Sequence, residues 1–588
     1  MDGFYGRILK IDLNREVFNI EKFGDDIYEK YLGGKGLGSY LLYELNPPGV
    51  DPLSPENHLI LATGPISGSA IWGSCRYGAF TKSPQTGFYS ESYSGGKVPE
   101  AIDSTGFDAI VIKGQCKHPT VLAIYPDGVD FHDAGDLWGK ETYETEDTVL
   151  KRFARSDDTF GRPGASVIGP AAENLVRFGV IKNDHWRSCG RTGVGTVMGA
   201  KKVKAILFQG DRKRPLHDKD AVRVISKKIA LEGKDNKGVE AYKTMGTSQM
   251  VKVLNNAYAF PTRYWSDGRY ENWEKISSDT FHRDLEVKPH SCLKCFMSCG
   301  RMTTVLQGRH AGLKLEGPEY ETIYAFGGLC LVDSIEEIAY LNDICDRLGM
   351  DTISAGNLCG LTIEAVRRGK VGFRIDYGEV DAIAELLQMI ARREGIGDIL
   401  ANGIKFAAKE WGLEDIAVHV KGMEPPGYDP RALKGMGLAY ATSDRGACHL
   451  RATFYKPELS GMISPDQIEG KAKLFVEFED RLTIFDTLIF CRFYRDMYPW
   501  EGLSEVIHAV TGLDAEIPAL KARAADISTL IRRFNLREGL KPEDDRLPKA
   551  FYKKFEHSEH VLKEDELETM LKEYYALRGW DENGQPIQ

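Results

Sequence analysis

The stretch Cys292-Leu-Lys-Cys295-Phe-Met-Ser-Cys299 decides how the rest of the chain is interpreted, because it carries three closely spaced cysteines. Thiolates in this C-x2-C-x3-C spacing can converge on one metal centre, and with one distant cysteine they match the ligand set of a [4Fe–4S] cluster. Structural zinc usually takes its thiolates as two C-x2-C pairs. Zinc, and three reduced cysteines in an ordinary loop, are the two alternatives.

Spacing alone does not choose the fourth ligand. Five cysteines follow the triplet: Cys330, Cys345, Cys359, Cys448 and Cys491. The chain has eleven cysteines, an odd number, and its first residues lack the basic and apolar regions of a signal peptide. We therefore expect a cytoplasmic protein whose clustered thiols bind metal, and no disulfide framework.

Composition excludes several classes of protein. The 588 residues carry 76 basic and 86 acidic side chains, a formal net charge of −10, so no general affinity for nucleic acid is expected. No apolar run approaches the ~18 residues that a membrane span needs.

The pattern along the chain changes near residue 211. Before it, short β-type runs alternate with turn signals, and we expect strands at residues 8–13, 58–62, 109–113, 120–125 and 205–209. After it, apolar residues recur at helical spacing and predict helices that include residues 221–231, 335–348, 383–390 and 474–489. We predict an α+β fold, with a β-rich domain at 1–211 and two mainly helical domains at 212–417 and 418–588.

Two stretches of the β-rich region combine glycine with arginine. Arg187-Ser-Cys-Gly190-Arg191 leads into a weak G-x-G-x-x-x-G match without a βαβ unit around it. The other is Gly73-Ser-Cys-Arg76-Tyr77. Glycine lets backbone N–H groups approach an anion, and arginine binds phosphate through paired donors. Two such stretches predict a large ligand with two phosphates, and a plain turn before a helix is the alternative for the first.

Taken together, these residues resemble the tungsten-containing aldehyde:ferredoxin oxidoreductase family. The resemblance implies a β-rich base domain, two helical domains and a metal buried between them. Its landmarks run from one end of the chain to the other: Phe4-Tyr5-Gly6-Arg7, Asp51-Pro52-Leu53-Ser54-Pro55-Glu56-Asn57, Gly64-Pro65, Ser83-Pro84, Glu316-Gly317-Pro318-Glu319-Tyr320-Glu321, Tyr428-Asp429-Pro430-Arg431 and Tyr574-Tyr575-Ala-Leu-Arg578-Gly579-Trp580.

The resemblance also implies the cofactors. One tungsten, or molybdenum in its place, would be held by two pterins beside a [4Fe–4S] cluster, whose ligands would be Cys292, Cys295, Cys299 and Cys491. A magnesium ion would link the pterin phosphates through the backbone carbonyls of Tyr93 and Ser188, oxygen donors that suit a hard cation. The implied pterin contacts are Arg76, Tyr93, Gly95, Arg187, Ser188, Gly190, Asp346, Met350, Asp351, Arg445, Arg451, Asp486, Phe490 and Arg492.

Three positions depart from the family pattern. The D-x-x-G-L-C motif reads Asp486-Thr-Leu-Ile489-Phe490-Cys491, so bulky residues replace glycine and leucine beside the pterin. Tyr93 stands where the family usually has asparagine. Tyr340 and Asp343 stand where some members hold a dimer-bridging iron with an E-x-x-H pair, so any homo-oligomer is expected to lack that iron.

The resemblance implies oxidation of an aldehyde with water to a carboxylic acid. Electrons would leave singly through the cluster to a ferredoxin or to electron-transfer subunits. Glu321 would be the general base, and His449 would hydrogen-bond the oxygen on which negative charge develops. Without the resemblance, Glu321 would be interpreted as an acidic residue at a helix start and His449 as a structural histidine.

Two other functions remain as alternatives. One is the active-site subunit of an aromatic acyl-CoA reductase, and the other is an iron–sulfur electron carrier or scaffold without a catalytic metal. Lys288, Lys294 and Arg301 flank the triplet. They either solvate the loop or form a basic dock for an acidic ferredoxin.

Overall fold

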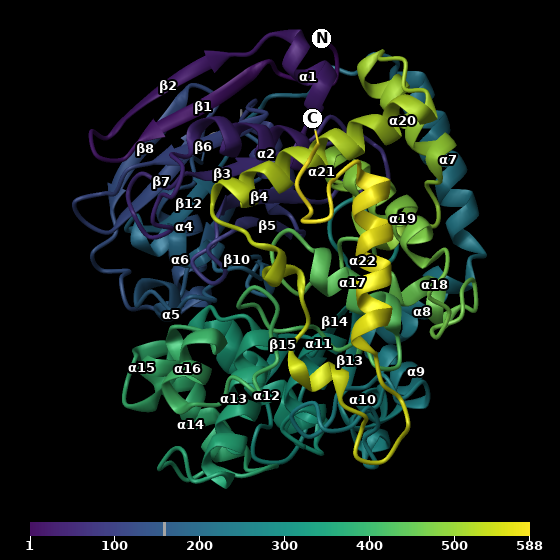
Figure 1. Ribbon diagram of the computed structural model, residues 1–588. Helices are drawn as coiled ribbons and strands as arrows, with labels where there is room; N and C mark the ends of the chain where they lie inside the picture. The colour runs from purple at the N-terminus through teal and green to yellow at the C-terminus, as the bar shows by residue number, and fades with distance from the viewer. Residues whose placement is uncertain (157–159, 588) are drawn as a thin grey trace.

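The computed structural model describes residues 1–156 and 160–587. Figure 1 shows two β-sheets formed by the early part of the chain, with helices making up most of the rest. The first sheet has the strand order β2-β1-β6-β3-β4-β5, in which only β1 and β6 are parallel neighbours. Its strands are β1 (Arg7–Asp12), β2 (Val17–Lys22), β3 (Leu59–Ala62), β4 (Tyr77–Lys82), β5 (Tyr89–Ser94) and β6 (Ala109–Lys113).

The second sheet has the order β11-β10-β9-β12-β7-β8, with β7 and β12 parallel. Its strands are β7 (Thr120–Tyr125), β8 (Gly128–Asp133), β9 (Gly164–Val167), β10 (Ile181–Asn183), β11 (Arg187–Cys189) and β12 (Val203–Phe208). The helices of this region are α1 (Asp25–Tyr31), α2 (Gly34–Leu45), α3 (Val98–Ser104), α4 (Thr142–Phe153), α5 (Pro170–Glu173) and α6 (Val194–Ala200).

The alternation of side chains along the strands explains how the two sheets pack. Leu61 and Ile110 point toward the second sheet and share a core with Leu122. Their neighbours Ile60 and Val111 point to the opposite face, where helices cover them. Because both faces of these strands are buried, the runs are continuously apolar, as is typical of covered sheets.

Helices dominate after residue 218. They are α7 (Lys219–Lys234), α8 (Lys237–Met245), α9 (Met250–Asn256), α10 (Ser278–Asp284), α11 (Tyr320–Thr322), α12 (Ile335–Leu348), α13 (Thr352–Arg367), α14 (Val380–Arg392), α15 (Ile396–Ala401), α16 (Ile404–Trp411), α17 (Lys434–Thr442), α18 (Tyr455–Leu459), α19 (Lys471–Leu488), α20 (Trp500–Thr511), α21 (Ile517–Arg537) and α22 (Glu564–Arg578). A third sheet holds β13 (Glu286–His290), β14 (Gly300–Thr304) and β15 (Lys314–Glu316), and the cysteine triplet forms the loop between β13 and β14.

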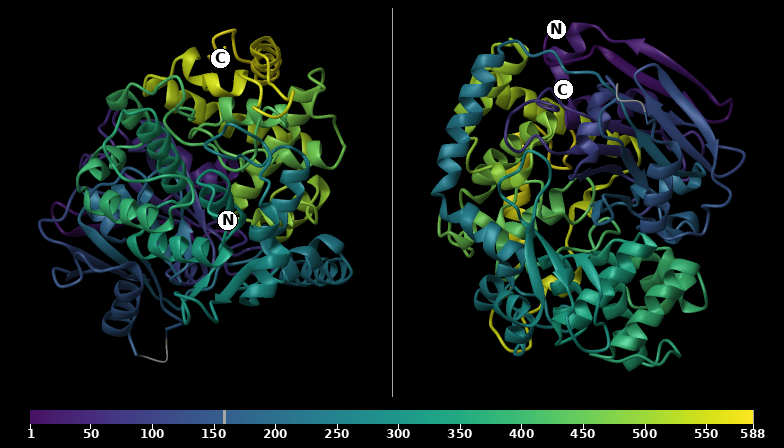
Figure 2. Two further views of the ribbon diagram at one scale, coloured as in Figure 1. Left: turned by 90° about the horizontal axis from the view of Figure 1, so that it is seen from below. Right: turned by 180° about the vertical axis from the view of Figure 1, so that it is seen from behind.

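The last part of the chain returns to the first sheet. Helices α19 and α21 pack against α2, so segments from the two ends of the sequence lie side by side (Figures 1 and 2). The turn after α19 therefore brings Cys491 to the edge of the N-terminal region. A separate core joins residues from both sides of position 417, among them Tyr324 and Tyr440.

The architecture confirms the α+β prediction and the expected strands and helices. The domain limits at 211 and 417 stay predictions. None of the helices in the described part of the chain has both the length and the apolar character of a membrane span.

Candidate active site and cysteine group

Three separate segments bring cysteines together. The triplet loop supplies Cys292 and Cys295, and the turn after α19 supplies Cys491. The thiol of Cys75, which lies just before β4, contacts the thiols of all three. Burial raises the pKa of Cys299, and the charges of Cys295 and Cys491 are near enough to add to that shift.

The other downstream cysteines lie elsewhere. Cys330, Cys345 and Cys359 are buried in the core of the helical region, and Cys448 accepts a hydrogen bond from Arg445 Nη2 at 3.0 Å. Cys75 was missed by the sequence analysis, although it stands inside the Gly73–Arg76 stretch that was singled out for its arginine. The described residues contain no group of three or more His, Cys, Asp or Glu side chains arranged to hold a single metal ion.

Arg76 and Gly95 lie against this group of thiols. The Nη2 atom of Arg76 donates to Cys491 Sγ at 3.3 Å. A Cβ atom on Gly95 would stand 2.8 Å from Cys292 Sγ and 2.9 Å from Arg76 Nη1, so a side chain there would displace one of them. Arg187 approaches from β11 and lies 2.5 Å from a carboxylate oxygen of the buried Glu316.

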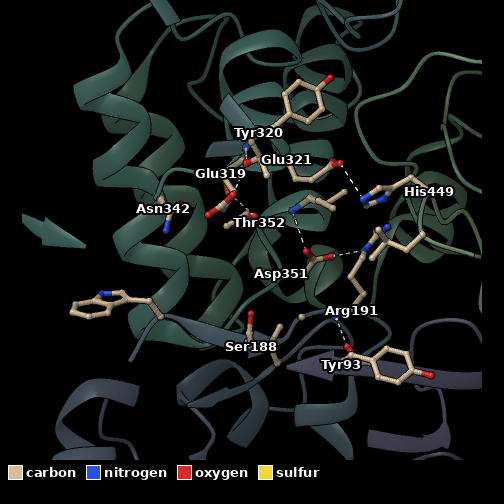
Figure 3. A pocket seen from close by; sticks show the side chains of 18 of the residues that line it. Tyr93, Ser188, Arg191, Glu319, Tyr320, Glu321, Asn342, Asp351, Thr352 and His449 are labelled. Atoms are coloured by element: carbon tan, nitrogen blue, oxygen red, sulfur yellow. Dashed lines mark hydrogen bonds and ion pairs between the residues drawn. The ribbon is translucent and has the colours of Figure 1, made fainter. Parts of the chain in front are cut away.

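A cavity of about 400 Å³ has Glu316, the ion-pair partner of Arg187, in its wall. Figure 3 shows side chains from the first and second sheets, from α11 to α13 and from the loop after α17 converging on it. Among the residues that the family resemblance singles out, those lining it are Tyr93, Ser188, Gly190, Glu321, Asp346, Met350, Asp351, Arg445 and His449.

Glu321 and His449 lie next to one another in the cavity wall (Figure 3). His449 Nε2 lies 3.4 Å from Glu321 Oε1, and the other carboxylate oxygen accepts a hydrogen bond from Gly427 N at 3.0 Å. Burial raises the pKa of Glu321 to about 8, although Gly427 and Arg191 oppose the shift. Burial, together with nearby arginines, lowers the pKa of His449 well below its usual value. The pair is therefore a protonatable carboxyl beside a neutral imidazole.

A second set of predicted residues forms a buried ionic network under β5. Arg451 pairs with Glu91 and lies 3.3 Å from Asp486 Oδ2, while Arg492 Nε donates to Asp486 Oδ1 at 3.0 Å. Burial alone would raise the pKa of Asp486, but Arg492, Arg451 and Lys35 outweigh it and lower that pKa. Glu91, which is fully buried, was missed because nothing in its local sequence marks it.

Asp351 and Asp346 hold the other side of the cavity. Asp351 is the N-cap of α13 and also accepts from Arg191 Nε at 3.1 Å. Asp346 lies 2.5 Å from Lys182 Nζ, and burial raises its pKa to about 6 against the effect of that lysine. Capping and the ion pairs explain both aspartates structurally, as well as placing them in the cavity wall.

The motif that departs from the family has its own packing. Ile489 ends α19 in the left-handed conformation, with φ 69° and ψ 34°. The ring of Phe490 packs against Phe485 and Tyr498 at centroid distances of 5.0 and 4.6 Å and does not line the cavity.

Lys288, Lys294 and Arg301, the three basic residues around the triplet, do not form one docking surface. Arg301 is 1% exposed and donates to backbone carbonyls, including those of Lys243 and Thr244. Lys288 pairs with Glu286 at 2.6 Å, and Lys294 donates to Gly68 O at 3.0 Å. A dock made of all three is therefore wrong, because Arg301 is a structural residue.

The cavity fits an anionic group of pterin type. Among the described residues, Arg445 Nε in the cavity wall has no hydrogen-bond partner, and neither does His449 Nδ1. Nitrogen atoms of Arg187 and Arg451 also lack one, but these two arginines are not in the cavity wall and each pairs with a buried glutamate. Buried polar atoms are almost always satisfied, so an unpaired arginine donor in a cavity wall indicates a site for phosphate or another anion. Thiols beside it are the donor type that iron–sulfur clusters take.

Comparison with known proteins shows the family of the chain. Residues 8–210 match the model of the aldehyde ferredoxin oxidoreductase N-terminal domain, and residues 224–588 match that of domains 2 and 3. The chain is 33% identical to the tungsten-containing aldehyde ferredoxin oxidoreductase of Pyrococcus furiosus, over 99% of this chain and 97% of that protein. It is 34% identical to the protein of the same description from Thermococcus kodakarensis, with the same coverage.

More distant relatives share the fold. The WOR-like subunit of an aliphatic sulfonate oxidoreductase from Pyrococcus furiosus is 28% identical over 100% of this chain and 96% of its own. A chain of the active-site complex of benzoyl coenzyme A reductase with 1,5-dienoyl-CoA superposes with a TM-score of 0.85 at 23% identity, covering 100% of this chain and 96% of that one. On these matches, the chain belongs to the aldehyde ferredoxin oxidoreductase family of oxidoreductases.

Proposed function

We propose that the protein oxidises aldehydes with water to carboxylic acids and passes the electrons one at a time to a ferredoxin or a similar carrier. The observation that carries the proposal is the Glu321 and His449 pair, which shares a cavity wall with the unpaired Nε of Arg445. An electron carrier without a catalytic site has no need of a buried acid–base pair.

The cofactors would be held by the residues already described. Cys292, Cys295, Cys299 and Cys491 would ligate the [4Fe–4S] cluster. The two pterins would be bound by the arginines and aspartates of the cavity wall and of the network below it, and their magnesium by the backbone of Tyr93 and Ser188. When bound, the tungsten centre would accept two electrons from the substrate and the cluster would accept them singly.

Glu321 would take the proton that the reaction releases from water or from the hydrated aldehyde. A carboxylate with a pKa near 8 is a stronger base than an ordinary glutamate, which suits this role near neutral pH. Its Oε1 atom lies at the cavity, 3.4 Å from His449 Nε2, while Gly427 holds the other oxygen. His449, neutral at these pH values, would donate one N–H to the substrate oxygen that becomes more negative.

Aromatic side chains suggest the substrate class. Tyr428 and Tyr455 stack at a centroid distance of 4.2 Å, and Tyr428 also stacks on His449 at 5.2 Å. Both tyrosines, with Tyr320 and Phe493, line the same cavity as the acid–base pair. Such walls favour aldehydes with an apolar or aromatic body over small hydrated ones.

Electrons would leave through the cysteine loop. Cys295 and Cys299 are partly exposed, whereas Cys292 and Cys491 are buried. A carrier protein that docks over this loop would come nearest to the cluster from that side.

The test is an aldehyde panel assayed with a viologen dye on protein purified without oxygen. We expect turnover of aromatic and long-chain aldehydes, and a fall of about 10²–10⁴-fold in kcat for Glu321→Gln. The control is Glu458→Gln, which alters a buried glutamate that binds Lys471 outside the cavity. Absence of aldehyde turnover in protein that holds its metals would contradict the proposal, as would full turnover by Glu321→Gln.

A further inference from the structure

Cys75 is a fifth cysteine in the group of thiols. Its side chain is 3% exposed, and its thiol contacts those of Cys292, Cys295 and Cys491. It belongs to the N-terminal region, so no spacing in the sequence connects it with the triplet. A [4Fe–4S] cluster takes four cysteine ligands, which leaves one thiol of the five without that role.

Hydrogen bonds of the residues next to Cys75 fix its position, and they do not depend on the conformation of its own side chain. Gly73 N donates to Lys294 O at 3.1 Å, and Cys491 N donates to Gly73 O at 2.9 Å. On the other side, Arg76 Nη2 reaches Cys491 Sγ at 3.3 Å. The residues that flank Cys75 are thus tied to both of the segments that carry the other cysteines.

We propose that Cys75 is a non-ligating thiol of the cluster site, whose S–H donates a hydrogen bond to a sulfur of the [4Fe–4S] cluster or of its ligands. The inference rests on the proposed function, in which Cys292, Cys295, Cys299 and Cys491 complete the ligand set. Three of those four come from one short loop, and Cys75 stands opposite that loop.

The consequence is a higher reduction potential. Reduction adds negative charge to the cluster, and a hydrogen bond to its sulfurs stabilises that charge. The neighbouring Arg76 acts in the same direction through its contact with Cys491. Cys75 would add a neutral donor in a site from which water is largely excluded, where such bonds are strong.

Three variants test the inference on protein purified without oxygen: Cys75→Ala, Cys75→Ser and the control Cys116→Ala. Cys116 is equally buried, at 2% exposed, but packs between the two sheets. Iron content and an EPR-monitored redox titration are the readouts. We expect all three variants to keep about four irons per chain.

For Cys75→Ala, we expect the equilibrium constant for reduction to fall about tenfold, which is about 59 mV for a one-electron couple. Cys75→Ser, whose hydroxyl still donates, should lower the reduction potential by less than half as much. Cys116→Ala should have the reduction potential of the wild type.

Each other outcome overturns a defined part of the account. Loss of iron from Cys75→Ala makes Cys75 a ligand, and an unchanged potential makes it a bystander; both overturn the inference and leave the proposed function standing. A wild-type protein without a [4Fe–4S] signal overturns the proposed function together with the inference.

Discussion

Glu321 and His449 lie with a carboxylate oxygen and an imidazole nitrogen 3.4 Å apart, although they come from α11 and from the loop after α17. The second ring nitrogen, His449 Nδ1, has no hydrogen-bond partner among the described residues. The pair therefore keeps a free ring nitrogen at the cavity, as an acid–base role requires.

The pH profile of turnover should follow Glu321. A general base must be deprotonated, and the pKa of Glu321 is about 8, so kcat should rise from pH 6 to about pH 8 and then level off. Because the pKa of His449 is lowered, that residue should stay neutral and add no further limb in this range. The measurement is kcat between pH 6 and 10 with a viologen acceptor. The same rise in Glu321→Gln would show that another group is responsible.

Glu321 should also reduce stability at high pH. Burial raises the pKa of Glu321 from 4.5 to about 8 in the folded protein. Its contribution to the free energy of unfolding is therefore present in full below about pH 4.5 and is lost as pH rises through 8. Glu321→Gln removes this dependence. From pH 6 to pH 9 the variant should gain about 3 kcal/mol relative to the wild type. Thermal unfolding at the two pH values measures the difference, and a constant difference would contradict the assignment.

The ionic network under β5 should be important for stability. Glu91 is fully buried, pairs with Arg451 and accepts hydrogen bonds from Tyr93 at 2.6 Å and from Lys35 at 3.2 Å. Glu91→Gln leaves two buried cations short of a charge partner and should lower the free energy of unfolding by about 3–5 kcal/mol.

The control for Glu91 is Glu21→Gln, which breaks a surface pair with Lys10 and should change stability by about 1 kcal/mol or less. Equal losses in the two variants would mean that the buried network contributes no more than a surface pair. Denaturant unfolding of both variants beside the wild type gives the comparison.

The left-handed backbone conformation of Ile489 should lower the stability of the folded protein. The residue is 1% exposed yet adopts a left-handed conformation, which costs an isoleucine about 1–2 kcal/mol relative to glycine. Ile489→Ala loses the packing and keeps the strain, whereas Ile489→Gly loses the packing and relieves the strain. Both should destabilise, with Gly more stable than Ala by about 1 kcal/mol. An alanine variant as stable as the glycine variant would rule out strain at this turn.

Local patterns predicted the regular structure well. The run at 109–113 coincides with β6 and that at 120–125 with β7, because apolar residues with β propensity fill both faces of buried strands. The helix predicted at 335–348 also has the predicted limits, with Ser334 as N-cap and Gly349 at its end. Ser334 Oγ accepts a hydrogen bond from Glu337 N at 3.3 Å, and the carboxylate of Glu337 binds Arg309.

The site was less accessible to such reasoning. The triplet was visible because its three cysteines are close in sequence, and Cys491 was identified only through the family resemblance. Cys75 and Glu91 were missed, because their partners are far away in sequence and only the packing of α19 and its following turn against the first sheet brings them together. Long-range contacts of this kind leave no periodic signal in the sequence.

The central claim is that Cys491 joins the triplet to hold a cluster beside a tungsten site. Elemental analysis with EPR, on wild type and Cys491→Ala purified without oxygen, tests it most directly. The account predicts about four irons and about one tungsten per wild-type chain, with the [4Fe–4S] signal lost in the variant. A wild-type protein without that signal, or a Cys491→Ala protein that keeps it unchanged, would contradict the account.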